Sequence, residues 1–322
     1  MTTTRVHWAG LAFLYVVWGA GYPAAEVMLE SIPPLLGIAA RSLVAGAVLL
    51  AIASVRSPRL AATPSELCWA AVVGLMLMFT NGLVVVGMQD VPAGIAALIA
   101  GSLPLWIVLL QARRASALDA IGVAVGFCGL ALLVAPGGVE GGAPLGALAL
   151  IVGSTALQAG GTLTAQRVPL PADAFTTMGV AMLAAALGMG ALGVAVGETP
   201  PATLEPSAML AWLFLAGPVA IGGYLTFTWL LRRVPAVTVS TYAYVNPVVA
   251  LLLAWALLGH AVTGGTLAGA ALILAAVAFV LARTEPRDEA GAGPEPRGRR
   301  RLIPRARGGR ARSRRARDRC PA

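Results

Sequence analysis

The chain has 322 residues, of which 58% are hydrophobic and 11% are charged, and its formal net charge is +9. Soluble domains carry charge on about 25% of their residues, because charged groups keep a protein surface hydrated. The composition therefore excludes an ordinary soluble protein and predicts a protein that is embedded in lipid.

Ten apolar stretches follow one another along the chain. They lie near residues 9–28, 33–53, 66–88, 92–111, 119–135, 145–166, 174–196, 207–230, 236–258 and 264–282. Each is close to the roughly 20 residues that a helix needs to cross about 30 Å of hydrocarbon. The first stretch is too long for the apolar region of a typical cleaved signal peptide, so we count it as a helix. The pattern predicts an all-α integral membrane protein with ten transmembrane helices.

The charges between these stretches alternate in sign from loop to loop. Basic residues occupy every second loop: Arg56 and Arg59, Arg113 and Arg114, Arg167, and Arg232 and Arg233. The loops between them contain Glu30, Asp90, Glu140, Glu198, Glu205 and His260, and no Arg or Lys. Because positive residues near the ends of membrane helices stay on the cytoplasmic side, both termini are predicted to be cytoplasmic.

Residues 284–322 differ in character from the rest of the chain. From Arg283 onward lie 14 of the 23 basic residues, among many Pro, Gly and Ala. Such a composition buries too little apolar surface to fold, so this tail is predicted to be disordered. Basic clusters next to a membrane attract anionic lipid headgroups, which we expect as its partners. Nucleic-acid binding is not expected, because the tail has no aromatic residues on which bases stack.

Two segments in different halves of the chain resemble each other. Residues 91–104 read VPAGIAALIAGSLP, and 143 positions later residues 234–247 read VPAVTVSTYAYVNP. Five predicted helices separate the two copies, and an odd number of crossings inverts the second copy in the membrane. The chain is therefore predicted to contain two inverted five-helix repeats, residues 8–136 and 143–283. Such repeats are typical of secondary transporters, whose substrates bind between the repeats near the membrane midplane.

Six segments in order resemble the EamA-type permeases of the drug/metabolite transporter superfamily. They are VVWGAGYPAA, PPLLGIAARSLVAG, AGIAALIAGSLPL, GGYLTFTWLLRRVPA, YAYVNPVVALLLAWALLGH and LAGAALILAAVAFVLA, and the resemblance covers residues 8 to 283. It implies a secondary transporter of the bacterial cytoplasmic membrane that exports small solutes and is coupled to protons. The chain departs from the family at His260, where many members have Glu.

Proline residues mark corresponding positions in the two repeats, Pro104 and Pro247. A proline inside a helix removes a backbone donor and leaves a carbonyl that hydrocarbon cannot satisfy. We expect the two broken helices to flank one central volume, with Ser102 near one and Asn246 near the other. Linking two helices by a hydrogen bond is the alternative role for Asn246.

Charged and aromatic residues inside the predicted helices are further candidates. Arg41 lies some eight residues inside its helix, where a charge costs about 3 kcal/mol unless it is paired or faces a cavity. Glu26, near the outer end of the first helix, is its predicted partner and a candidate proton carrier. Tyr242 is four residues before Asn246 and shares its helix face, although Tyr also favours membrane interfaces. The other predicted substrate-binding residues are Trp18, Tyr22, Asn81, Gln158 and Tyr224.

Signals of enzymatic chemistry are missing. The two histidines, His7 and His260, are predicted on opposite sides of the membrane, and no cysteine pair has metal-ligand spacing. Neither a metal nor a cofactor is therefore expected. No P-loop occurs, so direct use of ATP is not expected either. Cys68, Cys128 and Cys320 are read as packing residues and an incidental thiol.

The leading hypothesis is a secondary active transporter that moves small metabolites, amino-acid-like or drug-like solutes by alternating access. An electroneutral exchanger or facilitator is the alternative within transport. An integral membrane enzyme that acts on lipid-linked substrates would need several titratable groups at one interface. A membrane scaffold that recruits partners through the basic tail is the remaining alternative.

Overall fold

A computed structural model describes residues 2–56, 62–111, 116–134, 143–234, 238–239 and 241–291. Within these ranges every long element is helical. The elements are α1 (Thr2–Met28), α2 (Pro34–Arg56), α3 (Pro64–Leu77), α4 (Phe79–Gly87), α5 (Ala93–Ala100), α6 (Leu103–Leu110), α7 (Ala117–Val134), α8 (Leu145–Ala165), α9 (Ala174–Ala195), α10 (Pro206–Phe214), the π-helix η2 (Leu215–Gly222), α11 (Gly223–Leu231), α13 (Tyr242–Leu258) and α14 (Gly264–Gly291).

These helices fall on the apolar stretches of the sequence. Seven helical runs in the described part of the chain are long and apolar enough to cross a membrane. Three further apolar helices are shorter: Ala120–Leu133, Tyr242–Leu258 and Gly264–Phe279. The prediction of an all-helical membrane protein is thus confirmed, whereas ten crossings remain a prediction.

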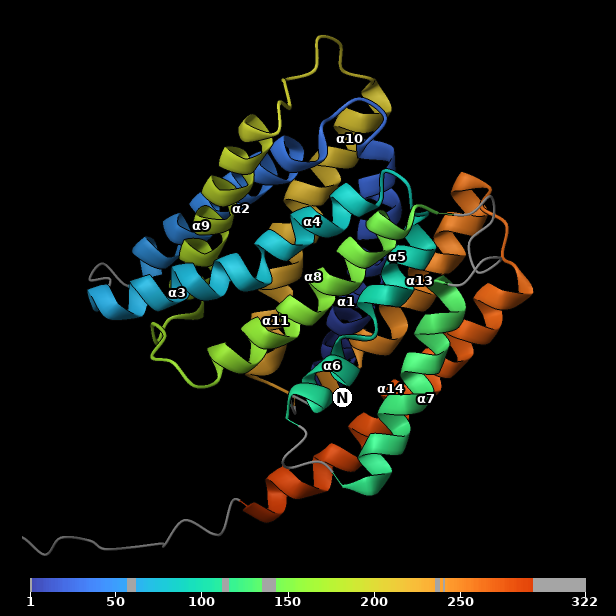
Figure 1. The fold of residues 1–322 in the computed structure, drawn as a ribbon. Helices are drawn as coiled ribbons and strands as arrows, with labels where there is room; N and C mark the ends of the chain where they lie inside the picture. Colours follow the sequence, from blue (N-terminus) through green and yellow to red (C-terminus); the bar gives the residue numbers. More distant parts are fainter. Residues whose placement is uncertain are drawn as a thin grey trace, which may run out of the picture.

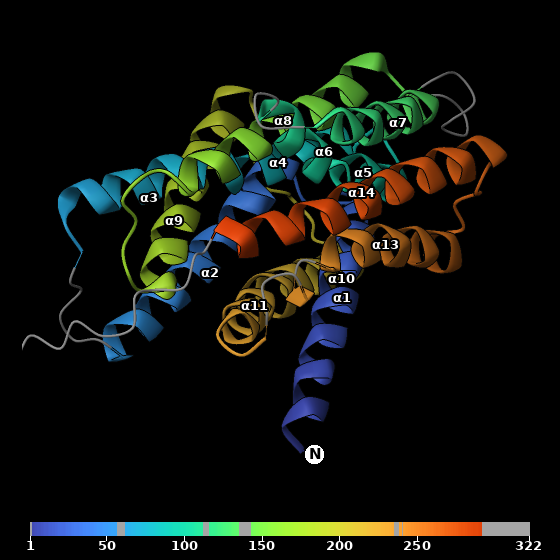
Figure 2. The same cartoon turned by 90° about the horizontal axis from the view of Figure 1, so that it is seen from below.

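Helices from the two predicted repeats pack against each other throughout the bundle. In Figure 1, α2, α3 and α9 form one side of the molecule, and α7, α13 and α14 form the other. α2 packs along α9, α7 packs along α14, and α1 packs along α13. The N-terminal end of α1 projects from the bundle (Figure 2). The described helices of the two predicted repeats therefore pack together in one bundle.

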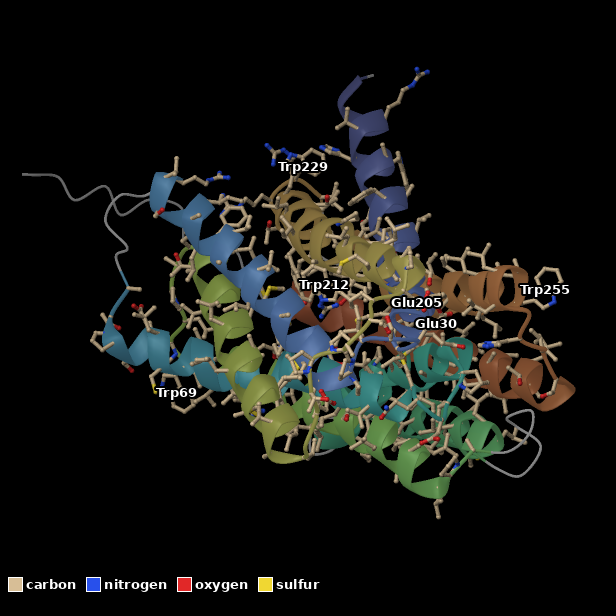
Figure 3. The ribbon with its side chains drawn as sticks, turned by 90° about the horizontal axis from the view of Figure 1, so that it is seen from above. Glu30, Trp69, Glu205, Trp212, Trp229 and Trp255 are labelled. Atoms are coloured by element: carbon tan, nitrogen blue, oxygen red, sulfur yellow. The ribbon has the colours of Figure 1, made fainter. Side chains whose placement is uncertain are left out.

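Large apolar side chains cover the outside of the bundle. Leu187 is 73% exposed, Leu257 is 71% exposed, and Trp255 and Trp69 lie at the periphery (Figure 3). Soluble monomers rarely expose apolar surface on this scale, because water solvates it poorly. This surface is suited to contact with the hydrocarbon chains of lipids.

Three of the helical runs are interrupted near the middle. Met78 separates α3 from α4, Gly101 and Ser102 separate α5 from α6, and η2 separates α10 from α11. Met78 and Ile221 of η2 are 143 positions apart, the same offset as the two similar segments. Stretches of π-helix are rare and often occur at functional sites. We therefore looked for a functional site in the interior of the bundle, where the interrupted helices meet.

The structure corrects two predictions about helix ends. Pro247 does not break its helix, because α13 begins at Tyr242 and continues through Pro247 to Leu258. The predicted disordered tail also begins too early, because residues 284–291 continue α14. Once a helix has formed, each added residue costs little, so a helix can extend past its apolar part. Several predictions fall on residues outside the described ranges, namely those for Arg59, Arg113, Arg114, Glu140, Cys320 and the rest of the tail from residue 292.

Candidate functional site

A cavity of about 440 Å³ lies in the middle of the bundle. Its walls come from both predicted repeats, including α1, α2, α5, α8, η2 and α13. Ten of the twelve residues selected from the sequence line it. They are Trp18, Tyr22, Arg41, Asn81, Pro104, Gln158, Tyr224, Tyr242, Asn246 and Pro247. These ten residues, from seven different helices, thus line one central cavity.

Trp18 is the centre of an aromatic cluster on one wall. Its ring centroid lies 4.8 Å from that of Tyr242, 5.5 Å from that of Phe227 and 5.6 Å from that of Tyr224. The indole Nε1 donates a hydrogen bond of 3.2 Å to the carbonyl of Val219 in η2. Because the irregular helix leaves this carbonyl accessible, Trp18 attaches α1 to the α10–η2–α11 run. The cluster combines a broad apolar surface with phenolic hydroxyls.

Asn246 serves both of the roles that the sequence left open. With its amide turned so that the nitrogen faces the neighbouring carbonyls, Nδ2 lies 3.2 Å from the carbonyl oxygens of Tyr242 and Tyr15. Tyr15 belongs to α1, so Asn246 links α13 to α1 while it also lines the cavity. Pro247 donates no hydrogen bond to the carbonyl of Ala243, and Ala243 lines the cavity as well.

Two further amides line the cavity, Asn81 from the first predicted repeat and Gln158 from the second. Asn81 Nδ2 is 4.0 Å from the sulfur of Met78, which also accepts a hydrogen bond of 3.1 Å from the Tyr224 hydroxyl. Gln158 on α8 lines the cavity, and its amide makes no hydrogen bond with any residue that the structure describes. A free amide can donate and accept, so Gln158 is available to a bound solute.

Arg41 reaches the cavity from α2 and has no partner there. Its Nε is completely buried and makes no hydrogen bond, and the guanidinium forms no ion pair within the described parts of the chain. The predicted ion pair with Glu26 is therefore wrong. The physical reason is that Glu26 is held by other groups at the end of α1.

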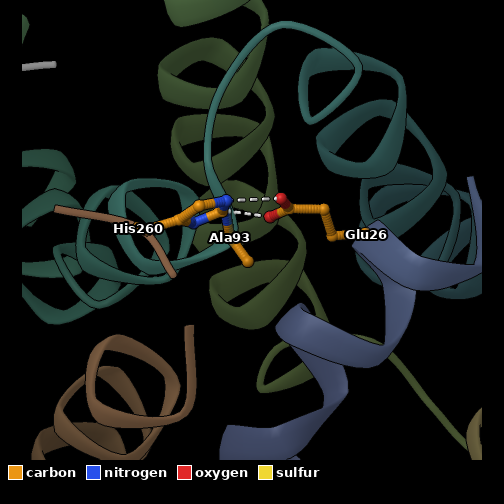
Figure 4. Close-up of polar contacts among 3 residues, drawn as sticks. All are labelled: Glu26, Ala93 and His260. Atoms are coloured by element: carbon orange, nitrogen blue, oxygen red, sulfur yellow. Dashed lines mark hydrogen bonds and ion pairs between the residues drawn. The ribbon is translucent and has the colours of Figure 1, made fainter. Parts of the chain in front are cut away.

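Glu26 accepts from two partners that come from distant parts of the chain (Figure 4). Oε1 lies 2.9 Å from His260 Nε2, and Oε2 accepts a hydrogen bond of 2.7 Å from the backbone nitrogen of Ala93. Ala93 is the first residue of α5, where the exposed N–H groups attract a carboxylate. One side chain thus ties the ends of α1, α5 and α13 together.

The position of His260 depends on a glycine. Gly259 ends α13 in the left-handed conformation, with φ of 72°, which glycine adopts without steric cost. The turn lets the backbone nitrogen of His260 reach the carbonyl of Ala254, a distance of 3.3 Å. This local geometry directs the histidine back toward Glu26 at the end of the bundle that the sequence places outside.

Ser102 does not face the cavity. It is fully buried, its hydroxyl donates to the carbonyl of Ile99 at 2.6 Å, and it accepts from Trp106 Nε1 at 3.2 Å. The predicted role of Ser102 beside the central volume is therefore wrong. A hydroxyl at a helix interruption is readily used by the local backbone instead.

Comparisons with known proteins agree with this architecture. The model of the EamA-like transporter family matches residues 7–135 and 145–282. The chain belongs to the EamA-like transporter family. This EamA-like protein is 35% identical over 262 residues to the uncharacterized inner membrane transporter YedA of Escherichia coli K12, a match that covers 77% of the chain and 81% of YedA.

Two further matches are less similar in sequence. The uncharacterized transporter YvbV of Bacillus subtilis is 25% identical over 297 residues, which are 88% of the EamA-like chain and 94% of YvbV. A solved structure described only as "Crystal structure of protein" superposes with a TM-score of 0.57 at 24% identity, over 87% of this chain and 99% of that one. This likeness supports the fold alone. The EamA-like chain is a multi-pass cell membrane protein, and its relatives point to transport rather than enzymatic activity.

A second hollow of about 680 Å³ lies at the loops of the EamA-like protein, beside Glu198. Glu198 accepts from the backbone nitrogens of Leu35 at 3.1 Å and Leu36 at 2.8 Å, so its carboxylate caps α2. Nearby, Ser207 donates to Glu30 at 3.1 Å, and the two loops that carry Glu30 and Glu205 meet in Figure 3. These polar groups hold loops together, so we place the functional site in the central cavity.

Sequence reasoning missed several cavity residues. Met78 accepts from Tyr224, and Phe227 packs against Trp18 and Tyr242. Phe227 follows Tyr224 by three positions on one helix face, which is a signal that was available in the sequence. Nothing local marks Met78, because methionine is an ordinary packing residue in apolar helices.

Proposed function

We propose that this EamA-like protein is a secondary transporter that carries a small solute across the cytoplasmic membrane through its central cavity. The observation that carries this proposal is the cavity itself. It lies between the helices, it combines aromatic walls with polar groups, and its lining comes from both predicted repeats. Ligand pockets have this character, with a few placed polar groups in an apolar surround.

We propose further that the ten helices form two inverted five-helix repeats, with both termini in the cytoplasm, and that the protein exports by alternating access. The two stretches that match the family model support this arrangement, as does the 143-residue offset of Met78 and Ile221. Inverted repeats allow one unit to rock against the other around a site between them.

The topology is tested by labelling single cysteines from either side of sealed vesicles. Cysteines at Asp90 and at Arg232, in a variant without the native cysteines, are expected to react from opposite faces. Labelling of both positions from one face would rule out the inverted arrangement.

Transport is tested in proteoliposomes loaded with solutes that do not cross lipid unaided. Phenylalanine, glucose and 3-phenylpropanesulfonate represent an amino acid, a sugar and an organic anion. Ala100 lines the cavity, and Ala100→Trp should fill it and reduce counterflow of any transported probe at least tenfold. The control is Leu252→Trp on the lipid-facing surface, where Leu252 is 55% exposed. Equal transport by both variants would contradict transport through the cavity.

We propose that Glu26 carries the proton if transport is coupled to protons. The described lining of the cavity contains no carboxylate, which favours the alternative of an electroneutral exchanger or facilitator. Glu26→Gln should abolish proton flux if Glu26 carries the proton. Unchanged proton flux would remove Glu26 from the mechanism, and the absence of any proton flux in the unsubstituted protein would establish the alternative.

A further inference from the structure

Arg41 is the single charged residue among the described residues that line the central cavity. The rest of the lining is aromatic, aliphatic or neutral and polar. A guanidinium stays charged in any protein environment, so it cannot lose its charge when water is excluded. The described lining of the cavity therefore carries one positive charge and no negative one.

No acidic side chain within the described ranges pairs with this charge. The closest predicted counter-charge, Glu26, is bound to His260 at 2.9 Å and to the Ala93 nitrogen at 2.7 Å. Buried ionisable groups in membrane proteins are normally paired, and those that face a cavity mark pathways for substrates or ions. The counter-ion of Arg41 is thus expected to come from outside the chain.

The shape and chemistry of the walls restrict what this ligand can be. One cation balances one negative charge, so a dianion would leave a charge unpaired. A zwitterion would bring an ammonium group for which the described lining offers no carboxylate. The rings of Trp18, Phe227 and Tyr242 pack together and offer an apolar surface in the same cavity as Arg41.

We propose that the central cavity binds organic monoanions, with Arg41 pairing with the acid group and the aromatic wall covering the apolar body. This inference rests on the proposed role of the cavity as the transport site. Guanidinium and carboxylate or sulfonate groups are complementary, because two parallel N–H groups meet two oxygens.

The test compares ligands that share a skeleton and differ only in charge. Purified protein in an uncharged detergent without lipid is titrated calorimetrically with 3-phenylpropanoate, 3-phenylpropanamide and phenylalanine, and with hexanoate and hexanamide. At least one acid should bind at least tenfold more tightly than its amide, and phenylalanine should bind no better than the amide. If no acid binds, or if an amide binds as well as its acid, the proposal is overturned.

Two substitutions on the same helix then assign the preference to Arg41. Arg41→Gln should reduce the ratio of acid to amide affinity to about one, and Arg41→Lys should retain part of it. Arg56→Gln is the matched control, because Arg56 lies at the end of α2 with its guanidinium 4.9 Å over the Phe175 ring. A preference for acids that survives Arg41→Gln overturns the proposal. If Arg41→Gln does not fold, Arg41→Lys and the acid–amide comparison on the unsubstituted protein still decide.

Two outcomes separate this inference from the function on which it rests. Transport of phenylalanine or glucose without transport of 3-phenylpropanesulfonate would leave the transport function standing and overturn the monoanion. Stabilisation by phosphatidylglycerol that requires Arg41 and that acids do not compete away would assign the charge to a lipid phosphate, which also overturns the proposal.

Discussion

Arg41 and Glu26 carry opposite charges on the first two helices of the chain, and they differ in whether their side chains have partners. Glu26 has two partners from distant segments and stands at the end of the bundle, with 25% of its side chain exposed. Arg41 lies at the cavity with its Nε buried and unpaired. We therefore expect Glu26 to stabilise the fold and Arg41 to lower the stability of the protein without a ligand. Charges that are retained without a structural partner are expected where a ligand binds.

The largest expected effect is on Glu26. Glu26→Ala leaves both His260 and the Ala93 N–H without their acceptor, and an unsatisfied buried group costs about 1–3 kcal/mol. We expect the free energy of unfolding to fall by about that amount, measured by reversible unfolding in mixed micelles.

Glu30→Ala is the control for this substitution. Glu30 is exposed near the same end of α1 and accepts from Ser207, so its loss should change stability by less than about 0.5 kcal/mol. His260→Ala should cost less than Glu26→Ala, because Ala93 keeps its acceptor. If Glu26→Ala is no worse than Glu30→Ala, Glu26 does not tie the three helices together.

The second expected effect has the opposite sign. Arg41→Met removes an unpaired charge and keeps an unbranched apolar chain, so the ligand-free protein should become more stable by about 1–2 kcal/mol. The same unfolding assay measures it. A loss of stability would show that Arg41 acts as a structural clamp and stabilises the fold, as Glu26 does.

Two of the three cavity amides, Asn246 and Gln158, differ in the same way, with a smaller expected effect. Asn246 is linked to carbonyls of α13 and α1, whereas the Gln158 amide has no hydrogen bond within the described ranges. Asn246→Ala should lower the free energy of unfolding by about 0.6 kcal/mol, the typical contribution of an interhelical hydrogen bond in a membrane. Gln158→Ala should leave stability unchanged. Equal effects of the two substitutions would show that the hydrogen bonds of Asn246 do not contribute to stability.

The smallest expected effect concerns Tyr224. Its hydroxyl donates to the Met78 sulfur at 3.1 Å, and thioether sulfur is a weak acceptor. Tyr224→Phe keeps the ring that packs against Trp18 and should change stability by less than about 0.5 kcal/mol. A larger loss in the unfolding assay would mean that this contact between α11 and Met78 contributes more than an ordinary weak hydrogen bond.

Much of the fold follows from local features of the sequence. Helix ends fall within a few residues of most predicted boundaries, because apolar length and loop charge are properties of short segments. Trp18, Tyr242 and Asn246 were found through their polarity inside apolar stretches, and all three line the cavity. A polar group in a membrane helix stands out because hydrocarbon would not tolerate it facing lipid.

The wrong predictions concern which side chains pair, where a side chain points and where a helix begins. Glu26 and His260 are 234 positions apart, so no feature of either neighbourhood reveals their contact. Ser102 stands beside an interruption as expected, yet its hydroxyl bonds locally to Ile99 instead of facing the cavity. The helix break predicted at Pro247 is absent, because α13 begins at Tyr242 and continues through the proline. In each case the outcome depends on which groups surround the side chain.

By itself, the sequence determined that this protein lies in lipid, that it is helical, and which polar side chains enter the membrane. These are matters of transfer free energy and of backbone hydrogen bonding within one segment, so composition and spacing decide them. The tertiary structure alone decided that Glu26 is paired and Arg41 is not. Pairing depends on distances between segments that only packing brings together, and the energy of a charge in low dielectric changes steeply with those distances.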